Sequence, residues 1–162
     1  MRKIYIVIFI IFLNISAFAS DDKNIFSTWE GLEVDKCASI WLIKRFINTE
    51  AKIIFFPKGT QINRGIPFDT PDASLRRYHN ISTFVSILKQ YNIKDSALIH
   101  MGKIINDIEI NKWHQKKFIK TPEVQKTINR IISETHSNKE TLEKCFDYFD
   151  SLFIKSKTSR NL

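Results

Sequence analysis

The alternation of hydrophobic and polar residues along the chain predicts helices more often than strands. Apolar residues fill most positions of 35–47, so we expect a core helix there, with Asp35 as its N-cap. Helical periods recur at 82–91, 95–108, 121–132 and 137–153. Two of these segments begin with start signals, Thr121-Pro122 and the Ser137/Glu140 capping-box pair.

Strand patterns are fewer and shorter. The run Lys52 to Phe56 is β-branched and aromatic and is followed by Pro57, as in a buried strand. Leu75 to His79 is expected to form a second strand, although the Arg76-Arg77 pair leaves its register open. The prediction is a mostly helical α+β domain, with about five helices packed on a small two- or three-stranded sheet.

The first residues have the pattern of a cleavable secretory signal at 1–19. Arg2 and Lys3 precede the apolar run Ile4 to Leu13, and an A-x-A cleavage site ends at Ala19. The apolar run is about half the length that a bilayer core requires, so we expect no stable membrane insertion after cleavage. The protein is therefore expected to be exported, to a periplasmic or extracellular location.

The remaining chain is expected to contain one domain at 29–155, between a flexible lead-in at 20–28 and a basic tail at 156–162. The formal net charge is +8 and falls by two when Arg2 and Lys3 leave with the signal. This balance suits a small anionic ligand. Nucleic acid is not an expected partner, because the basic residues are scattered except at 112–120 and 155–160.

Cys37 and Cys145 are the two cysteines. An oxidising compartment permits a disulfide between them, but both lie among apolar neighbours in helical segments. Two buried, unreactive thiols are the alternative, and the sequence leaves the choice open.

Five polar residues lie beside apolar segments, where an ionisable side chain must be paired or used: Asp35, Arg45, Asp69, His79 and Glu109. His79 could bind a metal or move a proton, and Glu109 ends a helix, where a carboxylate opposes the dipole and calls for a partner. Each also has a purely structural interpretation, such as a cap for Asp35 or a surface ion pair for Arg45. The sequence lacks a phosphate-binding glycine loop, a G-x-S-x-G elbow and a dinucleotide fingerprint.

The stretch from Glu33 to Ile47, with its Asp, Ala, Trp-Leu-Ile and Arg-Phe in that order, resembles the signature of the chromate resistance exported protein family. The same domain forms the C-terminal part of certain chromate-responsive regulators. Shorter blocks also fit, in the order Pro67-Phe68-Asp69, His79 with Phe84, Asp95 to Leu98, Ile104 to Glu109 and Phe149 to Phe153. The resemblance therefore covers nearly the whole chain after the signal.

The family's recurring polar residues fall on Asp35, Arg45, Asp69 and His79, with Glu109 where relatives usually have Asp. Where many relatives have a His, this chain has Glu33, and Ser82 and Val85 stand where a Cys and an acidic residue often flank the Phe. These departures argue against thiol-dependent redox chemistry. They leave oxygen and imidazole ligands suited to a hard or borderline metal ion, or to proton transfer.

The leading hypothesis is an exported accessory protein of the chromate-resistance type that binds a metal ion or an oxyanion. A divalent metal would be held by Asp35, Asp69, His79 and Glu109, and an anion would be bound by Arg45 with Asp35. One alternative is a metal-assisted or acid–base enzyme with His79 as candidate base. Another is a structural or partner-binding envelope protein.

Overall fold

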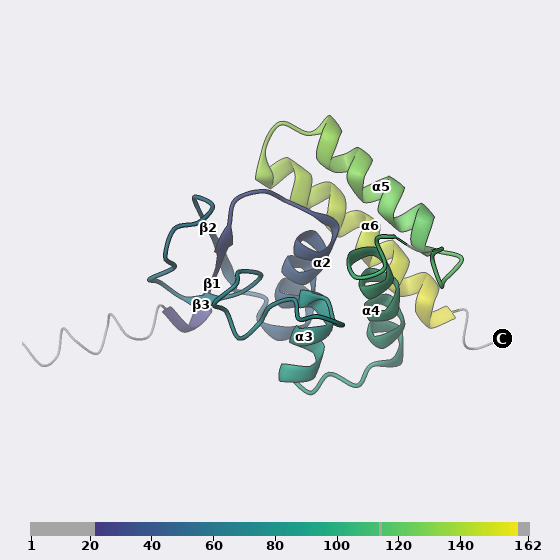
Figure 1. Ribbon diagram of the computed structural model, residues 1–162, viewed down its shortest axis with the longest axis horizontal. Helices are drawn as coiled ribbons and strands as arrows, with labels where there is room; N and C mark the ends of the chain where they lie inside the picture. The colour runs from purple at the N-terminus through teal and green to yellow at the C-terminus, as the bar shows by residue number, and fades with distance from the viewer. Residues whose placement is uncertain (1–21, 114, 159–162) are drawn as a thin grey trace, which may run out of the picture.

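The computed structural model describes residues 22–113 and 115–158. The predicted signal at 1–19 lies outside these residues and stays a prediction. Within the described residues, five α-helices pack around and beside a three-stranded parallel sheet (Figure 1), which confirms the expected α+β class. None of the helices in this part of the chain is both long and apolar enough to cross a membrane.

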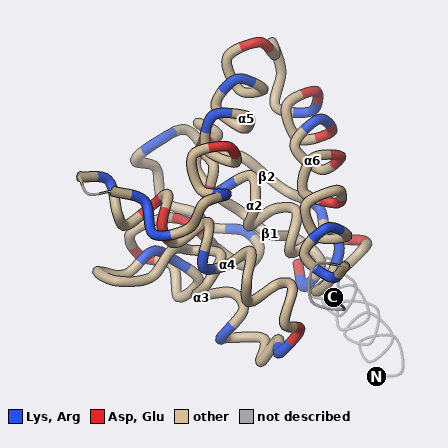
Figure 2. Tube along the Cα trace, turned by 90° about the vertical axis from the view of Figure 1, so that its right-hand side faces the viewer, with Lys and Arg blue, Asp and Glu red and all other residues tan. Residues whose placement is uncertain are grey.

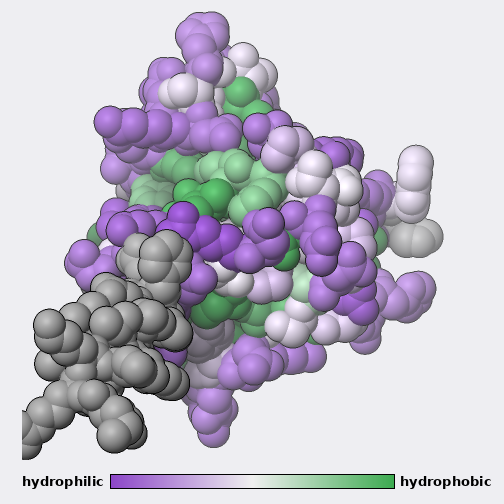
Figure 3. Space-filling model, turned by 90° about the vertical axis from the view of Figure 1, so that its left-hand side faces the viewer, coloured by the Kyte–Doolittle hydropathy of each residue, from purple (hydrophilic) through white to green (hydrophobic). Residues whose placement is uncertain are grey.

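The sheet has the order β2-β1-β3, with β1 (Ile25–Trp29) between β2 (Lys52–Phe56) and β3 (Ile66–Pro67). A short 3-10 turn, η1 (Asp22–Asn24), leads into β1. Both pairings are parallel, with Phe26 opposite Ile53 on one side and Ile66 on the other. The sheet lies at one side of the molecule, and the surface there shows an apolar area framed by hydrophilic side chains (Figure 3).

The central strand corrects the expectation of a flexible lead-in at 20–28. Ile25 to Thr28 are all buried, because β1 has a strand on each edge and helices beside it. The buried hydroxyl of Ser27 donates a hydrogen bond to the carbonyl oxygen of Arg64, at 2.7 Å. Gly65 lets the segment before β3 approach β1, since a Cβ there would lie 2.5 Å from Ile25 Cγ2.

The first α-helix is the core helix that the sequence predicts. All residues of α2 (Val34–Leu42) are buried, and the helix continues as a π-helical segment, η2 (Ile43–Ile47). The helix connects β1 to β2, which are parallel, and parallel neighbouring strands require a crossover connection of this kind. Trp41 packs against Phe149 of the last helix, with ring centroids 5.8 Å apart.

The remaining helices are α3 (Thr83–Gln90), α4 (Ser96–Glu109), α5 (Thr121–Glu134) and α6 (Asn138–Thr158). Asp95 caps α4 by accepting from the N–H groups of Ala97 and Leu98, as predicted. Ser137 caps α6 by accepting from the N–H of Glu140, at 3.2 Å. The predicted N-cap of α5 is wrong by one residue, because Thr121 is its first helical residue and Lys120 precedes it.

Two further expectations are wrong. Leu75 to His79 form no strand, and only Leu75 makes an isolated bridge, to Phe68, so the Arg76-Arg77 pair lies on a loop. The basic tail was expected to begin at residue 156, which is too early, because α6 continues to Thr158 and Ser156 is buried. Along α6, basic and acidic positions alternate in the chain trace (Figure 2).

Candidate functional site

A charged pocket of about 520 Å³ lies where the sheet meets the start of α2 and the end of α4. Its acidic lining residues are Glu30, Glu33, Asp35, Asp69 and Glu109. Its basic lining residues are Lys36, Lys58, Arg76, Arg77 and Lys112. We refer to it below as the charged pocket.

Asp35 is buried to 3% exposure and caps a helix other than its own. Its two carboxylate oxygens accept from the backbone N–H groups of Thr83, at 2.7 Å, and Phe84, at 2.9 Å. Ser82 accepts from the next N–H, that of Val85, so the free donors at the start of α3 are satisfied. The prediction that Asp35 caps α2 is therefore wrong: the N-cap of α2 is Glu33, and Asp35 ties α2 to α3.

Asp69 follows β3 with φ of 53°, a left-handed conformation that Asp adopts more readily than most residues. Oδ1 accepts from the hydroxyl of Thr83 at 2.6 Å, and Oδ2 lies 3.6 Å from the ammonium of Lys36. Thr83 therefore bonds to Asp69 through its hydroxyl and to Asp35 through its N–H. Burial raises the pKa of Asp69, although the Thr83 hydroxyl and the Lys36 charge oppose the rise.

The Asp35 carboxyl has a pKa raised to about 7, chiefly because burial disfavours its charged form and secondly because Asp69 is negatively charged. The two backbone N–H groups oppose this rise. Glu109 adds a smaller repulsion to both Asp35 and Asp69. The negative charges of Asp69 and Glu109 therefore lie close enough to Asp35 to raise its pKa.

Lys36 already supplies a cation to this cluster. Its side chain is almost fully buried, and its Nζ donates to the carbonyl oxygens of Trp29 and Gly31, both at 2.8 Å. Its third hydrogen can point toward Asp69. Among the described residues, no group of three or more His, Cys, Asp and Glu side chains is arranged to hold a metal ion.

Glu109 ends α4 and is bound by two cations, the partners that a carboxylate at a helix C-terminus calls for. Arg77, from the loop before α3, donates to Oε1 of Glu109, and the ammonium of Lys112 lies 3.4 Å from the same oxygen. The Glu109 side chain is 8% exposed, whereas those of Arg77 and Lys112 are each 50% exposed. The buried carboxylate thus holds two accessible cations next to each other.

The predicted site residues come together only in part. Asp35, Asp69 and Glu109 all line the charged pocket. His79 is exposed and lines a neighbouring hollow of about 570 Å³, which Glu109, Arg77 and Lys112 also line.

Arg45 is not among the residues that line the charged pocket. It lies on η2 and pairs with Asp150 of α6, its Nη2 2.8 Å from Oδ2, so its expected place in an anion site with Asp35 is wrong. The same carboxylate accepts from the indole N–H of Trp41, at 2.7 Å. This position corresponds to the surface ion pair that was the structural interpretation of Arg45.

The basic residues of the pocket were not predicted as site residues. Arg76 and Arg77 looked like an interruption of a strand, and Lys112 looked like part of a solvated basic patch. The signal that could have identified them is Glu109, because a buried carboxylate at a helix C-terminus requires cations close by.

These features define a small, mostly helical α+β domain in which one pocket gathers buried carboxylates and accessible cations. Residues 26–156 match the family model described as "ChrB, C-terminal domain", and the chain therefore belongs to this family of chromate-resistance-related proteins. The match confirms the resemblance seen in the sequence. Comparisons with curated proteins and with solved structures gave no match.

Proposed function

We propose that this protein is an exported accessory protein of the chromate-resistance type that binds a small oxyanion in the charged pocket. The observation that carries the proposal is the pair of half-exposed cations, Arg77 and Lys112, held on the buried Glu109. An oxyanion needs such donors fixed in advance, because the ordering of flexible side chains would otherwise reduce its affinity.

The distribution of charge between interior and surface favours an anion over a cation as ligand. The carboxylates of Asp35 and Glu109 are buried and already accept hydrogen bonds, whereas Lys58, Arg77 and Lys112 are exposed around the pocket. Two exposed acids, Glu30 and Glu33, line the β1–α2 side. An anion would therefore bind on the side of Arg77 and Lys112, away from these acids.

The test is calorimetric titration at low salt with chromate, and with sulfate and phosphate as tetrahedral competitors. Arg77→Ala should weaken binding at least tenfold, the effect of losing one charge-assisted hydrogen bond of about 1.5–3 kcal/mol. Arg77→Lys should recover only part of the affinity, because an ammonium lacks the planar fork. Lys139→Ala, an exposed lysine on α6, is the matched control.

Absence of anion binding by the wild-type protein, or equal binding by wild type and Arg77→Ala, would contradict the proposal. The metal hypothesis predicts a different result in the same assay. Addition of a divalent cation should then produce binding that Asp69→Asn and Glu109→Gln abolish and Arg77→Ala leaves intact. Either result separates an oxyanion site from a metal site.

Export is the second part of the proposal and is supported by the basic, apolar and A-x-A pattern at 1–19. Expression of the full chain with a C-terminal tag in a bacterium should yield a periplasmic protein whose N-terminus is Ser20. Mass spectrometry of the tagged protein gives the cleavage site directly. An intact N-terminus on a cytoplasmic product would contradict export.

An acid–base enzyme is the second candidate, because His79 and Glu109 line the same hollow. In that case His79 would accept a proton from a substrate bound between Arg77 and Lys112. Oxyanion binding by His79→Ala should equal that of wild type, and any turnover found with a candidate substrate should be lost. A turnover that His79→Ala retains would exclude this role for the imidazole.

A further inference from the structure

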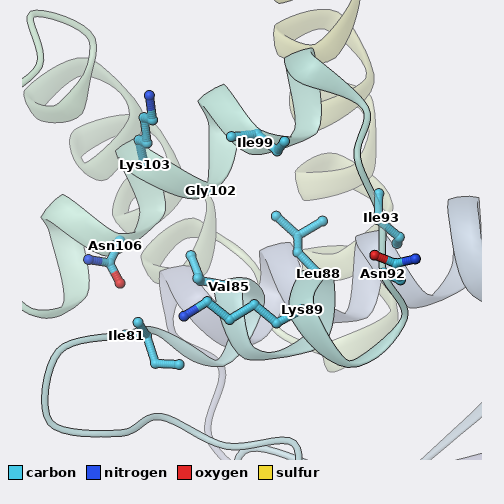
Figure 4. A pocket seen from close by; sticks show the side chains of 10 residues that line it. All are labelled: Ile81, Val85, Leu88, Lys89, Asn92, Ile93, Ile99, Gly102, Lys103 and Asn106. Atoms are coloured by element: carbon cyan, nitrogen blue, oxygen red, sulfur yellow. The ribbon is translucent and has the colours of Figure 1, made fainter.

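A second cavity, separate from the charged pocket, lies between α3 and α4 and has a volume of about 480 Å³. The two helices line it with matching faces at the spacing i, i+3, i+4, i+7. On α3 and the residues after it these are Val85, Leu88, Lys89 and Asn92, and on α4 they are Ile99, Gly102, Lys103 and Asn106. Ile81 and Ile93, on either side of α3, complete the lining (Figure 4). We call this cavity the α3–α4 groove.

The groove is apolar along its walls and basic at its edge. Of the described residues that line it, the charged ones are Lys89 and Lys103, and none is acidic. Figure 4 shows the Lys89 side chain extending toward Ile81, on the side where Asn106 lies. Leu88, Ile93 and Ile99 lie toward the opposite end in the same view.

This arrangement matches a ligand that has an apolar body and one anionic head. Apolar walls with a few placed polar groups, in a volume of several hundred Å³, are typical of small-molecule sites. Ile99 is 40% exposed, so this wall presents apolar surface to solvent. The two ammonium groups, with no acid in the lining, favour a negative charge on the ligand.

We propose that the α3–α4 groove binds an aliphatic monocarboxylate, with its chain along Leu88, Ile93 and Ile99 and its carboxylate near the ammonium group of Lys89, at the end of the groove where Ile81 lies. The eight residues of α3 span about 12 Å. An extended chain advances roughly 1.2 Å per bond, so about ten carbons reach that length. Decanoate is therefore the probe of choice.

The experiment titrates decanoate, kept below its micelle concentration, into the wild-type protein and follows backbone amide shifts by NMR. Saturable shifts should appear at residues of α3 and α4. Ile99→Glu places an acid on the apolar wall at an exposed position, and it should weaken binding at least tenfold. The double variant Lys89→Glu/Lys103→Glu should have a similar effect, whereas Lys139→Glu on α6 should bind as wild type does.

Decan-1-ol separates recognition of the chain from recognition of the head group. It should bind at least tenfold more weakly than decanoate, because it lacks the charge that the lysines complement. Equal binding of alcohol and acid would overturn the proposed carboxylate recognition. Absence of saturation, or equal decanoate binding by wild type and Ile99→Glu, would overturn the site. Arg77→Ala should leave decanoate binding unchanged, since no residue that the structure describes lines both cavities.

Discussion

The burial of Asp35 should make the stability of the protein depend on pH between about 4 and 7. Asp35 is 3% exposed, its carboxyl accepts from the N–H groups of Thr83 and Phe84, and the pKa of this carboxyl is raised from 3.8 to about 7. The informative perturbation is Asp35→Asn, which keeps the shape of the side chain and removes its titration.

The magnitude follows from the size of the pKa shift. Each pKa unit corresponds to 1.36 kcal/mol, so a rise of about three units corresponds to about 4 kcal/mol. The folded state binds the Asp35 proton up to about pH 7, whereas the unfolded chain releases it near pH 4. Stability therefore declines as the pH rises through this interval, and the contribution is constant below it and above it. The Asn variant should lack this decline.

The assay is urea unfolding followed by circular dichroism at half-unit steps from pH 4 to 8, with linear extrapolation to water. The free energy of unfolding of wild type minus that of Asp35→Asn should fall by about 4 kcal/mol from pH 4 to pH 7. Asp69 is present in both proteins, so most of its own titration cancels. Asp72→Asn, an exposed carboxyl on the loop after Asp69, is the control and should track wild type.

A difference that stays constant from pH 4 to 7 would refute the reasoning. A difference that rises with pH would refute it more strongly. It would mean that the N–H groups at the start of α3 stabilise the carboxylate by more than burial destabilises it, so that the pKa of Asp35 lies below 3.8.

Three further predictions test individual contacts. Gly65→Ala should lower the melting temperature by several degrees, at about 1–3 kcal/mol, because φ is +73° and the new Cβ would lie 2.5 Å from a methyl of Ile25. Cys37 and Cys145 are both free and buried, and the pKa of Cys37 is raised, first by its hydrogen bond with Cys145 and then by burial. Ellman's reagent should therefore detect no thiol in the native protein and two after denaturation without reductant; none after denaturation would reveal a disulfide instead. Asp150→Ala should lower the free energy of unfolding in urea by about 1–3 kcal/mol, mainly because the buried indole N–H of Trp41 loses its acceptor. Asp150→Asn keeps an acceptor, so an equal loss of stability in that variant would contradict this explanation.

The helices were the predictable part of the fold because their signals are local. The side chains of Asp95 and Ser137 accept hydrogen bonds from backbone N–H groups two or three residues further along the chain. Both partners of each hydrogen bond are therefore visible in one short stretch of sequence. The apolar character of 35–47 likewise predicts a core helix without knowledge of its neighbours.

The central strand could not be predicted in the same way. Ile25–Trp29 contains Ser27 and Thr28, and a buried strand of that composition depends on partners far along the chain. The hydroxyl of Ser27, for example, is satisfied by a carbonyl 37 residues away. The strand β2 was predictable because Ile53 to Phe56 are apolar, whereas β1 becomes a strand only through its neighbours β2 and β3.

The candidate site was predicted around three acids, Asp35, Asp69 and Glu109, together with His79 and Arg45, and in the structure Asp35 and Glu109 bind groups of the protein itself. Asp35 caps α3 through both of its carboxylate oxygens, and Oε1 of Glu109 is shared by Arg77 and Lys112. A buried acid that already accepts from donors of the protein is poorly placed to bind a ligand directly, but it can fix the cations that do. Glu109 itself need not contact the anion. Glu109→Gln should nevertheless reduce oxyanion binding, because it releases both cations from the oxygen that they share. If Glu109→Gln instead bound the anion more tightly, the carboxylate would be acting only as a competing negative charge, and the proposed preorganisation would be wrong.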